Sequence, residues 1–406
     1  MARIVQKFGG TSVADIERIK NAAQLVKMEH DAGHQVVVVV SAMAGVTNQL
    51  VDYVNQIDDT FDPREYDSVV STGEQSNAGL MALAIKSLGI KSRSWLGWQI
   101  PIQTDAIYEK ARITNIATEE LNKCLAEREI VVIPGFQGIS PENRITTLGR
   151  GGSDLTAVAL AGALKADRCD IYTDVDGIYT TDPRIVNKAQ KLDKITYEEM
   201  LEMASLGSKV LQTRSVELAM NYNVKVQVRS SFENIPGTIV VSEDEIMEQQ
   251  VVSGISQSKD EAKITLLKVA DRPGIAAAIF GPLADAEINV DMIVQNVSEN
   301  GKTTDLTFTV GKIDLEKAVN VLKKNKSDIG IGEIVADSDV VKISVVGVGM
   351  RSHAGVAQKM FMTLADKGIN IKVISTSEIK VSVLVAEEYG ELAIRALHTA
   401  YGLDAD

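Results

Sequence analysis

The sequence predicts an α/β protein with a mostly parallel sheet covered by helices on both faces, followed by two smaller α+β units. Two observations lead to this prediction. Short apolar runs alternate with helical patterns through residues 1–240, which is typical of a parallel sheet buried on both faces. Further along, residues 273–289 recur at a constant offset as residues 354–370. A repeat of this kind indicates two copies of one small domain.

The elements expected in the first part of the chain follow from this alternation. The expected strands are 2–7, 35–41, 66–71, 129–133, 169–173 and 225–229, and the expected helices are 13–30, 46–57, 74–88, 154–164, 197–206 and 210–221. Ser12 is expected to cap the first helix, with Asp15 three residues later as in a capping box. Ligands of such sheets bind at the carboxyl ends of the strands, so we expect the loops 9–12, 41–47 and 71–74 to meet at one rim.

The composition changes over residues 242–262, and the acidic, polar residues 242–245 at its start indicate a linker before the second part. Each copy of the repeat predicts a strand, a helix, two strands and a helix, and the first copy adds a strand at 332–336. The second copy lacks this strand, and we expect the spare strand 251–256 to fill the vacancy. The expected divisions are 1–242 for the sheet domain, 243–262 for the linker with the spare strand, and 263–338 and 339–406 for the repeat units.

Composition excludes several classes of protein. The 406 residues are enough for two to three domains, and 45% of them are hydrophobic. A net charge of −13 argues against broad nucleic-acid binding, which needs a basic face. Two cysteines provide neither a disulfide framework nor a metal cluster and favour a reducing cytoplasm. We expect no membrane span and no signal peptide.

The first chemical signal is the loop that follows the first strand. Gly9 and Gly10 carry no Cβ, so the backbone can turn sharply there and let a bulky anion approach. The N-terminus of the next helix offers free N–H groups and a partial positive charge, and Lys7 adds a full charge. These features indicate half of a site for a phosphorylated nucleotide. The alternative is an ordinary corner between a strand and a helix.

A second glycine-rich loop, residues 146–154, directly precedes another helix. Its glycines let backbone N–H groups face an anion, and the helix dipole adds to them. Arg150 has the shape to bind a carboxylate with two hydrogen bonds. Asp154 could cap the helix, hold Mg²⁺, or do both. The alternative here is a plain glycine-rich turn with a capping aspartate.

Residues 173–184 form a turn-rich loop that carries three carboxylates, a tyrosine and an arginine. The loop lacks the ligand run of a calcium-binding loop, so a nucleotide-lining role is favoured. Lys209 precedes a helix and suits a second phosphate-neutralising cation, although a solvated lysine is the usual case. No P-loop, protein-kinase or dinucleotide motif is present, since the glycine that a P-loop would need before residues 301–303 is replaced by Asn296.

Five motifs in order along the chain resemble those of the aspartate kinases, and the two repeats resemble the paired ACT domains of that family. The motifs are residues 7–12, 71–74, 149–154, 173–177 and 179–184. The resemblance covers essentially the whole chain. It implies the amino-acid-kinase fold, a three-layer αβα sandwich, followed by two βαββαβ ACT domains. It also implies phosphorylation of the aspartate side chain to 4-phospho-aspartate by ATP with Mg²⁺, on the route to lysine, threonine and methionine.

The resemblance also implies roles for single residues. Arg150 takes a substrate carboxylate and Glu74 the substrate ammonium, with Thr47 nearby. The catalytic set is Lys7, Arg150, Asp154 and Lys209. The ATP-binding set is Lys7, Phe8, Gly9, Gly10, Ser41, Ser153, Thr173, Asp174, Tyr179, Asp182, Arg184 and Lys209. No metal site of the protein's own is expected, since Mg²⁺ arrives with ATP and is at most touched by Asp154.

Regulation by lysine, threonine or both is implied for the ACT units, which bind amino acids at interfaces between paired units. A threonine-type site is expected at Asp271, Gly274, Ala276, Gln295, Asn370 and Ile371, and a lysine site at Ser352, Ser377 and Glu378. Gly274 is also explained as a turn residue of the repeat. We expect a homo-oligomer formed through the ACT domains, or an α2β2 assembly if Met247 starts a separate small subunit.

Two other functions remain open at this point. One is another amino-acid kinase that acts on glutamate, acetylglutamate or UMP; the paired repeats and Glu74 speak against it. The other is an amino-acid sensor that kept the kinase scaffold without its activity. Lys7, Arg150 and Asp154 together speak against a sensor.

Overall fold

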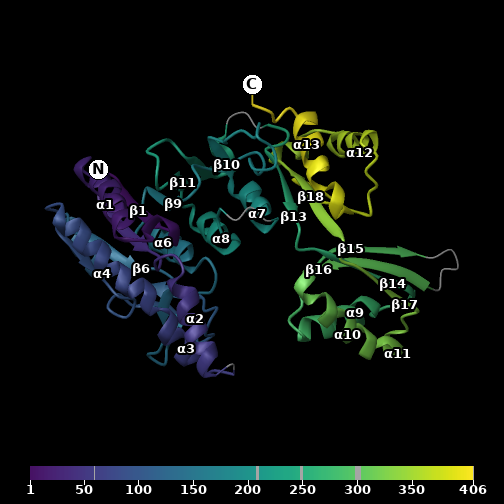
Figure 1. Cartoon of the computed structure of the whole chain (residues 1–406), viewed down its shortest axis with the longest axis horizontal. Coiled ribbons are helices and arrows are strands. Elements are labelled where there is room, and N and C mark those ends of the chain that lie inside the picture. The colour runs from purple at the N-terminus through teal and green to yellow at the C-terminus, as the bar shows by residue number, and fades with distance from the viewer. Residues whose placement is uncertain (59, 207–209, 247–249, 298–302, 406) are drawn as a thin grey trace. The chain divides into compact units, whose positions relative to one another are not determined.

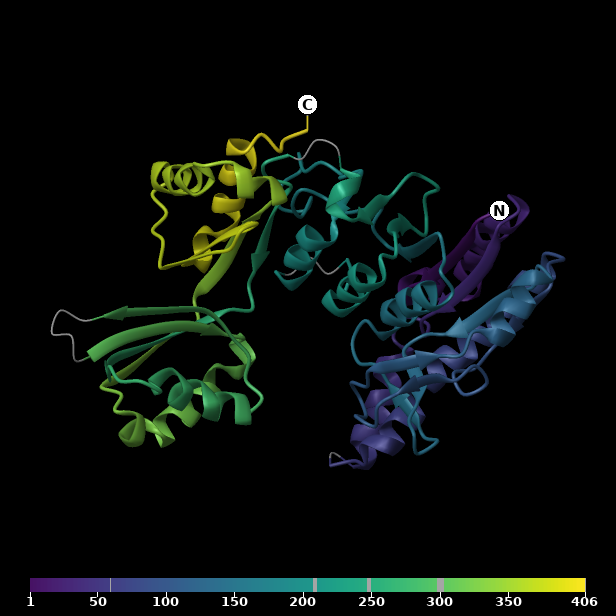
Figure 2. The same cartoon turned by 180° about the vertical axis from the view of Figure 1, so that it is seen from behind.

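The computed structural model divides into two compact units (Figures 1 and 2), and it describes residues 1–58, 60–206, 210–246, 250–297 and 303–405. The first unit contains residues 1–178, 191–205 and 210–246. The second contains residues 179–190, Leu206 and the described residues from 250 to 405. The segment 179–190 therefore packs with the second unit although both of its neighbours in the sequence belong to the first.

An eight-stranded sheet forms the centre of the first unit. Its strand order is β10-β12-β11-β9-β1-β2-β6-β3, and all neighbours are parallel except β11 and β12. The strands are β1 (Arg3–Phe8), β2 (Gln35–Val40), β3 (Ser92–Ser94), β6 (Ile130–Pro134), β9 (Arg168–Thr173), β10 (Lys194–Thr196), β11 (Val226–Ser230) and β12 (Thr238–Val241). The five consecutive valines of β2 are buried because helices cover both faces of the sheet.

Helices form the two outer layers of this sandwich. They are α1 (Ile16–Asp31), α2 (Val46–Ile57), α3 (Pro63–Val70), α4 (Thr72–Ser87), α5 (Glu119–Ala126), α6 (Gly152–Ala163), α7 (Tyr197–Ser205) and α8 (Thr213–Tyr222). The helices α1 and α4 pack together over β2 and β6, and α6 packs on β1 and β9 beside α8. The predicted three-layer αβα fold is confirmed.

The structure corrects two local predictions. Residues 66–71 are not a strand: 66–70 lie in helix α3 and Ser71 caps its end, because Asp62 accepts a hydrogen bond from the backbone of Arg64 and Pro63 occupies the first turn. The cap of α1 is Asp15, whose side chain accepts from the Arg18 amide, and not Ser12. Ser12 lies in a 3₁₀ turn (Gly10–Val13), and its buried hydroxyl donates to the Tyr172 carbonyl.

A small sheet in the first unit was not predicted, because its strands are only three or four residues long. It has the order β5-β4-β7-β8 and consists of β4 (Ile102–Thr104), β5 (Ile113–Ile116), β7 (Gln137–Ile139) and β8 (Ile145–Thr147). The last strand, β8, leads directly into the second glycine-rich loop. This sheet therefore helps to set the position of that loop.

The second unit contains two four-stranded antiparallel sheets that repeat one design. The first sheet has the order β15-β16-β14-β17 and the second β13-β18-β20-β19. The elements of the first are β14 (Ala262–Ala270), α9 (Ile275–Asp285), β15 (Val290–Val297), β16 (Thr303–Val310), α10 (Leu315–Lys324), α11 (Lys326–Ile329) and β17 (Glu333–Asp337). Those of the second are β13 (Gly254–Ser258), β18 (Val340–Val346), α12 (Val356–Asp366), β19 (Val373–Thr376), β20 (Lys380–Ala386) and α13 (Gly390–Ala400).

The strand that precedes the first repeat completes the second repeat. β13 pairs with β18 in antiparallel fashion, with Gly254 opposite Val346. It thereby takes the edge place that β17 holds beside β14 in the other sheet. The two repeat domains are thus interleaved along the chain.

The two repeat domains are also held together directly. Met292 and Val294 of β15 pack against Val373 of β19. Buried Lys342 lies 2.5 Å from the Glu261 carboxylate and 2.8 Å from that of Asp291, so strand β18 is joined to the residue before β14 and to the start of β15.

None of the helices in the described part of the chain combines the length and the apolar character that a bilayer crossing needs.

Candidate active site

A pocket of about 520 Å³ lies in the first unit, at the carboxyl ends of β1 and β2. The loop after β2, the first turn of α4, and the glycine-rich loop before α6 all contribute to its wall. Its lining residues are Lys7, Gly10, Ser41, Ala42, Met43, Ala44, Gly45, Thr47, Asn48, Tyr66, Glu74, Glu109, Phe136, Thr147, Gly149, Arg150, Gly151, Gly152, Ser153 and Asp154. Eight residues expected at the site thus meet at one rim: Lys7, Gly10, Ser41, Thr47, Glu74, Arg150, Ser153 and Asp154.

The positive charge at the floor of the pocket is held by a carboxylate. Lys7, at the end of β1, places its Nζ 2.5 Å from Oδ1 of Asp154, in the first turn of α6. Each side chain is only 10% exposed. The desolvation penalty of a buried ion pair is about as large as its electrostatic attraction, so the pair adds little stability. Its presence therefore indicates a functional use of the two charges. An entering anion can compete for the ammonium.

A second buried carboxylate faces the pocket without a cation. Oε1 of Glu74 accepts a hydrogen bond from the Ala42 amide, and Oε2 is buried with no hydrogen-bond partner among the described residues. Burial raises the pKa of Glu74 to about 7. An ammonium group that entered the pocket would supply the missing positive charge.

Arg150 stands at the mouth of the pocket on an exposed loop. The loop's base is fixed from two sides. Buried Asp67 of α3 accepts from the Thr147 amide at 2.8 Å and from its hydroxyl at 2.7 Å. Arg214 of α8 donates to the Leu148 carbonyl at 2.7 Å. These bonds set where the arginine can reach.

Gly151 is the residue of this loop least able to accept a side chain. Its φ is +70°, and a Cβ there would come within 1.9 Å of Cγ of Gln212. We expect Gly151→Ala to lower the efficiency with the amino-acid substrate at least tenfold, because the loop must shift. Gly89→Ala is the matched control, since its φ of +80° imposes the same backbone strain, about 1 kcal/mol, with nothing within 4 Å. Equal activity of the two variants would contradict this prediction.

The remaining nucleotide candidates lie apart from this lining. Phe8 is fully buried and stacks on Tyr172, and the Gly9 amide donates to the Tyr172 carbonyl. Thr173 ends β9 within the first unit, Asp174 follows it, and their side chains are hydrogen-bonded to each other. Tyr179, Asp182 and Arg184 lie on the segment that packs with the second unit. Lys209 and Met247 lie outside the described residues.

Several pocket residues were not found by sequence reasoning, among them Tyr66, Glu109 and Phe136. The pair Asp62-Pro63 is a helix-start signal, and it would have placed Tyr66 and Asp67 on a helix. Phe136 has a left-handed backbone conformation, with φ of +71°. Nothing in the neighbouring sequence predicts this conformation.

The residues expected to bind effectors lie on the second unit. Gly274, with φ of +89°, opens α9, and Gln295 lies on β15. Asn370 and Ile371 directly precede β19, which packs against β15. Asp271 and Ala276 flank the start of α9, Ser352 ends a 3₁₀ turn (Val348–Ser352), and Ser377 and Glu378 follow β19.

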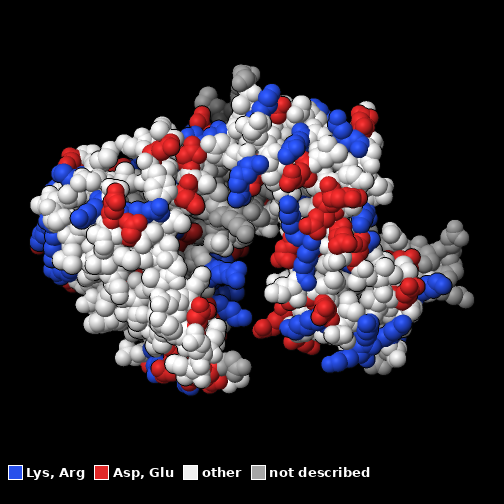
Figure 3. Space-filling view, in the orientation of Figure 1, with Lys and Arg blue, Asp and Glu red and all other residues white. Residues whose placement is uncertain are grey.

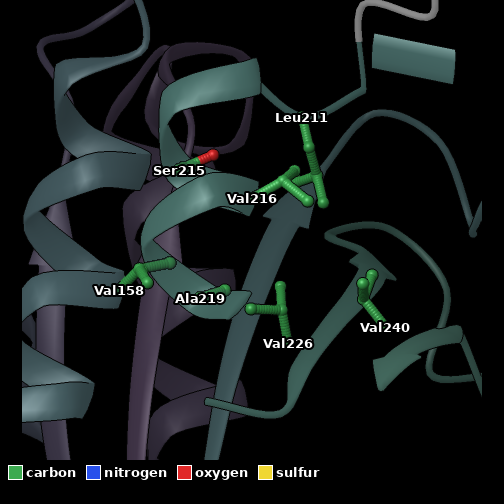
Figure 4. A pocket seen from close by; sticks show the side chains of 7 residues that line it. All are labelled: Val158, Leu211, Ser215, Val216, Ala219, Val226 and Val240. Atoms are coloured by element: carbon green, nitrogen blue, oxygen red, sulfur yellow. The ribbon is translucent and has the colours of Figure 1, made fainter. Parts of the chain in front are cut away.

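A second hollow is a packing feature. It lies between α6, α8, β11 and β12 (Figure 4) and has no room for a water molecule. Its wall is apolar except for Ser215, whose hydroxyl donates to the Gln212 carbonyl. On the face in Figure 3, acidic and basic side chains are interspersed over the described residues, without a broad basic surface.

Comparison with known proteins agrees with the fold. Residues 2–230 match the amino acid kinase family, and residues 263–326 and 343–401 each match the ACT domain. An aspartate kinase of Pseudomonas putida is 56% identical over 406 residues, which is 100% of this chain and 98% of that protein.

Two solved structures of Escherichia coli aspartokinase III are also similar. The complex with aspartate and ADP, in the R-state, has a TM-score of 0.81 at 27% identity and covers 98% of this chain and 99% of its own. The complex with lysine and aspartate, in the T-state, has a TM-score of 0.78 at 27% identity and covers 98% of each chain.

These matches define the class of the protein as an enzyme with a kinase domain and two ACT domains. The chain belongs to the amino acid kinase family, and within that family its similarity is to the aspartokinases over the whole length.

Proposed function

We propose that this protein transfers the γ-phosphoryl group of ATP to the side-chain carboxylate of L-aspartate, giving 4-phospho-L-aspartate. The pocket supports this through its combination of charges. It holds a cation at its floor in Lys7, a cation at its mouth in Arg150, and a buried carboxylate without a cation in Glu74. An amino acid with two carboxylates matches that set: the ammonium binds Glu74 and a carboxylate binds Arg150.

The chemistry needs little from the protein besides charge and alignment. The attacking carboxylate has an ordinary pKa of about 3.9 and is ionised at neutral pH, so no general base is required. The obstacle is repulsion between this anion and the triphosphate, which positive groups must offset. Lys7 and the backbone N–H groups before α6 are suited to this, and Thr47 and Ser41 add hydroxyl groups.

ATP and Mg²⁺ are the proposed cofactors. The carboxylate of Asp154 is an oxygen ligand of the kind Mg²⁺ prefers, and it lies beside the proposed phosphate cation. Bound Mg²⁺ would neutralise part of the charge on the phosphates. Asp154 then has two duties, to hold Lys7 in place and to receive the metal that ATP brings.

An assay of acyl phosphate tests the proposal. The product, trapped with hydroxylamine, and the release of ADP are measured with aspartate, glutamate, acetylglutamate and UMP in turn. We expect the hydroxamate with aspartate only. Turnover of another acceptor would indicate a different kinase, and no turnover with any of them would indicate a sensor without activity.

We further propose feedback inhibition by lysine, threonine or both, bound at the ACT domains. The resemblance and the two interleaved repeat domains support this, with Gln295 on β15 and Ile371 two residues before β19, the two strands where those domains meet. Inhibition requires that the effector bind the less active arrangement more tightly. The same assay with each amino acid added tests it. The proposed assembly is a homo-oligomer through the ACT domains, or α2β2 if Met247 starts a second product.

A further inference from the structure

The segment 179–190 leaves the first unit after Ile178 and returns to it at Lys191. Its ends are joined by a hydrogen bond from the Thr180 amide to the Gln190 carbonyl, 2.9 Å long. Between them, Val186 is buried in the core of the second ACT domain, in the cluster that contains Ile255 and Leu397. The segment is thus an excursion of the kinase domain that has been built into the core of the regulatory unit.

Polar contacts fix this excursion at one point. The Thr180 hydroxyl lies 2.8 Å from Nε2 of His398, and Nδ1 of His398 lies 2.8 Å from Oδ1 of Asp404. An ionised carboxylate only accepts hydrogen bonds, so Nδ1 of His398 donates to Asp404, and Nε2 shares its hydrogen bond with the Thr180 hydroxyl. The Thr180 oxygen in turn accepts from the Gln190 amide at 3.0 Å. The hydroxyl, both ring nitrogens and the carboxylate are thus all hydrogen-bonded within this chain.

Further contacts hold the same segment. The Thr180 carbonyl accepts from the Ile255 amide of β13 at 2.7 Å, and the Gln190 side chain donates to the Asp404 carbonyl. Arg395 of α13 donates to the Ile185 carbonyl at 3.0 Å. These bonds come from β13, from Asp404 and from α13, so the backbone of the segment is held at several points.

The order hydroxyl, imidazole, carboxylate is also that of a nucleophilic triad, but here it cannot serve as one. His398 is fully buried and Thr180 is only 2% exposed, so no substrate reaches the hydroxyl. A satisfied, buried polar network makes a structure specific. Its function is therefore to hold the backbone at Thr180 in one place.

We infer that the Thr180–His398–Asp404 chain positions the nucleotide loop of the kinase from within the second ACT domain. Tyr179 directly precedes Thr180 and Asp182 follows two residues later, and both are among the proposed ATP-binding residues. The inference rests on the proposed function. It assigns positioning roles to Thr180, His398 and Asp404, none of which lines the substrate pocket.

The test is the steady-state kinetics of Thr180→Val in the full-length protein. The valine keeps the volume and removes the hydroxyl. We expect the KM for ATP to rise about tenfold, the value of one well-made hydrogen bond, while the KM for aspartate changes less than twofold. Thr180→Ser, which restores the hydroxyl, should return the KM for ATP to near the wild-type value.

A matched control is Ser344→Ala. Ser344 is buried in β18 of the same domain and shares a 2.7 Å hydrogen bond with Ser382 of β20. We expect it to lower thermal stability and leave both KM values unchanged. Should Thr180→Val fail to fold, His398→Gln serves in its place, because its amide oxygen can still accept from Thr180 and its KM for ATP should then rise less than that of His398→Ala.

Three results would overturn the inference. They are an unchanged KM for ATP in Thr180→Val, an equal rise in both KM values, or the same effect from Thr180→Ser as from Thr180→Val. Titration with ADP, which needs no second substrate, measures the same loss directly. A wild-type protein that binds ADP without phosphorylating aspartate would contradict the proposed function, and the ADP affinity of Thr180→Val would still decide the positioning role.

Discussion

Lys7→Ala should lower kcat for acyl-phosphate formation by about 100- to 1,000-fold, the usual loss when one preorganised donor to a transition state is removed. The reason is that Lys7 carries the cation at the floor of the pocket, where the two reacting anions must approach each other. The measurement is kcat from hydroxamate formation at saturating ATP and aspartate. A variant with near-normal kcat would remove Lys7 from the mechanism.

The Lys7→Ala variant also leaves Asp154 as a buried carboxylate without its cation, which destabilises the fold. The double variant Lys7→Ala/Asp154→Asn separates the two effects. It should regain much of the thermal stability that the single variant loses, while kcat stays low. Lys91→Ala is the matched control for removal of a lysine, because Lys91 is 58% exposed and pairs only with surface Glu127 among the described residues. It should leave kcat unchanged.

Glu74→Gln should lower kcat/KM for aspartate by about 100-fold, because truncating one partner of a buried charge pair typically costs 2–5 kcal/mol. The wild-type efficiency should also rise with pH up to about 7, since burial raises the pKa of Glu74 to about 7 and only the ionised carboxylate attracts the ammonium. The glutamine variant cannot ionise, so its efficiency should lose that pH dependence. Glu65→Gln, on exposed Glu65 of α3, should retain both the efficiency and the pH profile.

Glu74→Gln should lower the catalytic efficiency but raise the stability of the fold. The folded-state pKa of Glu74 lies above its unfolded value, so protonation favours the fold and this contribution is lost as the pH rises from about 4.5 to about 7. At pH 8, the free energy of unfolding of Glu74→Gln without ligand should exceed that of the wild type by about 3 kcal/mol. The difference should vanish near pH 4. A destabilised variant at pH 8 would contradict the burial argument.

The elements that carry the site were predictable where local chemistry and tertiary environment agree. The five valines of β2, the glycines after β1 and the glycine-rich run before α6 each have one favourable structure. Gly10 and the glycine-rich run line the pocket, and β2 leads into it at Ser41. Residues 66–71 were mispredicted because their β-branched content suggested a strand, whereas Asp62 and Pro63 start a helix just before them.

Other parts could not be predicted, since they depend on packing between distant residues. Asp67 has no local signal for its task of binding Thr147, which lies 80 positions further along. Residues 179–184 read as one nucleotide loop with residues 173–177, yet the chain from Tyr179 to Gln190 packs with the second unit. Its partners, His398 and Asp404, lie more than 200 residues away in the sequence.

The sequence by itself determined the kind of protein: an alternation of buried strands and helices, two glycine turns next to Lys7 and Arg150, and a repeated small domain. These features are local, because backbone freedom, capping and periodic burial act over a few residues. Only the tertiary structure decided that Glu74 faces the pocket as a buried carboxylate and that Thr180 is tied to His398. Both depend on desolvation and hydrogen bonds between groups that the chain brings together only when it folds.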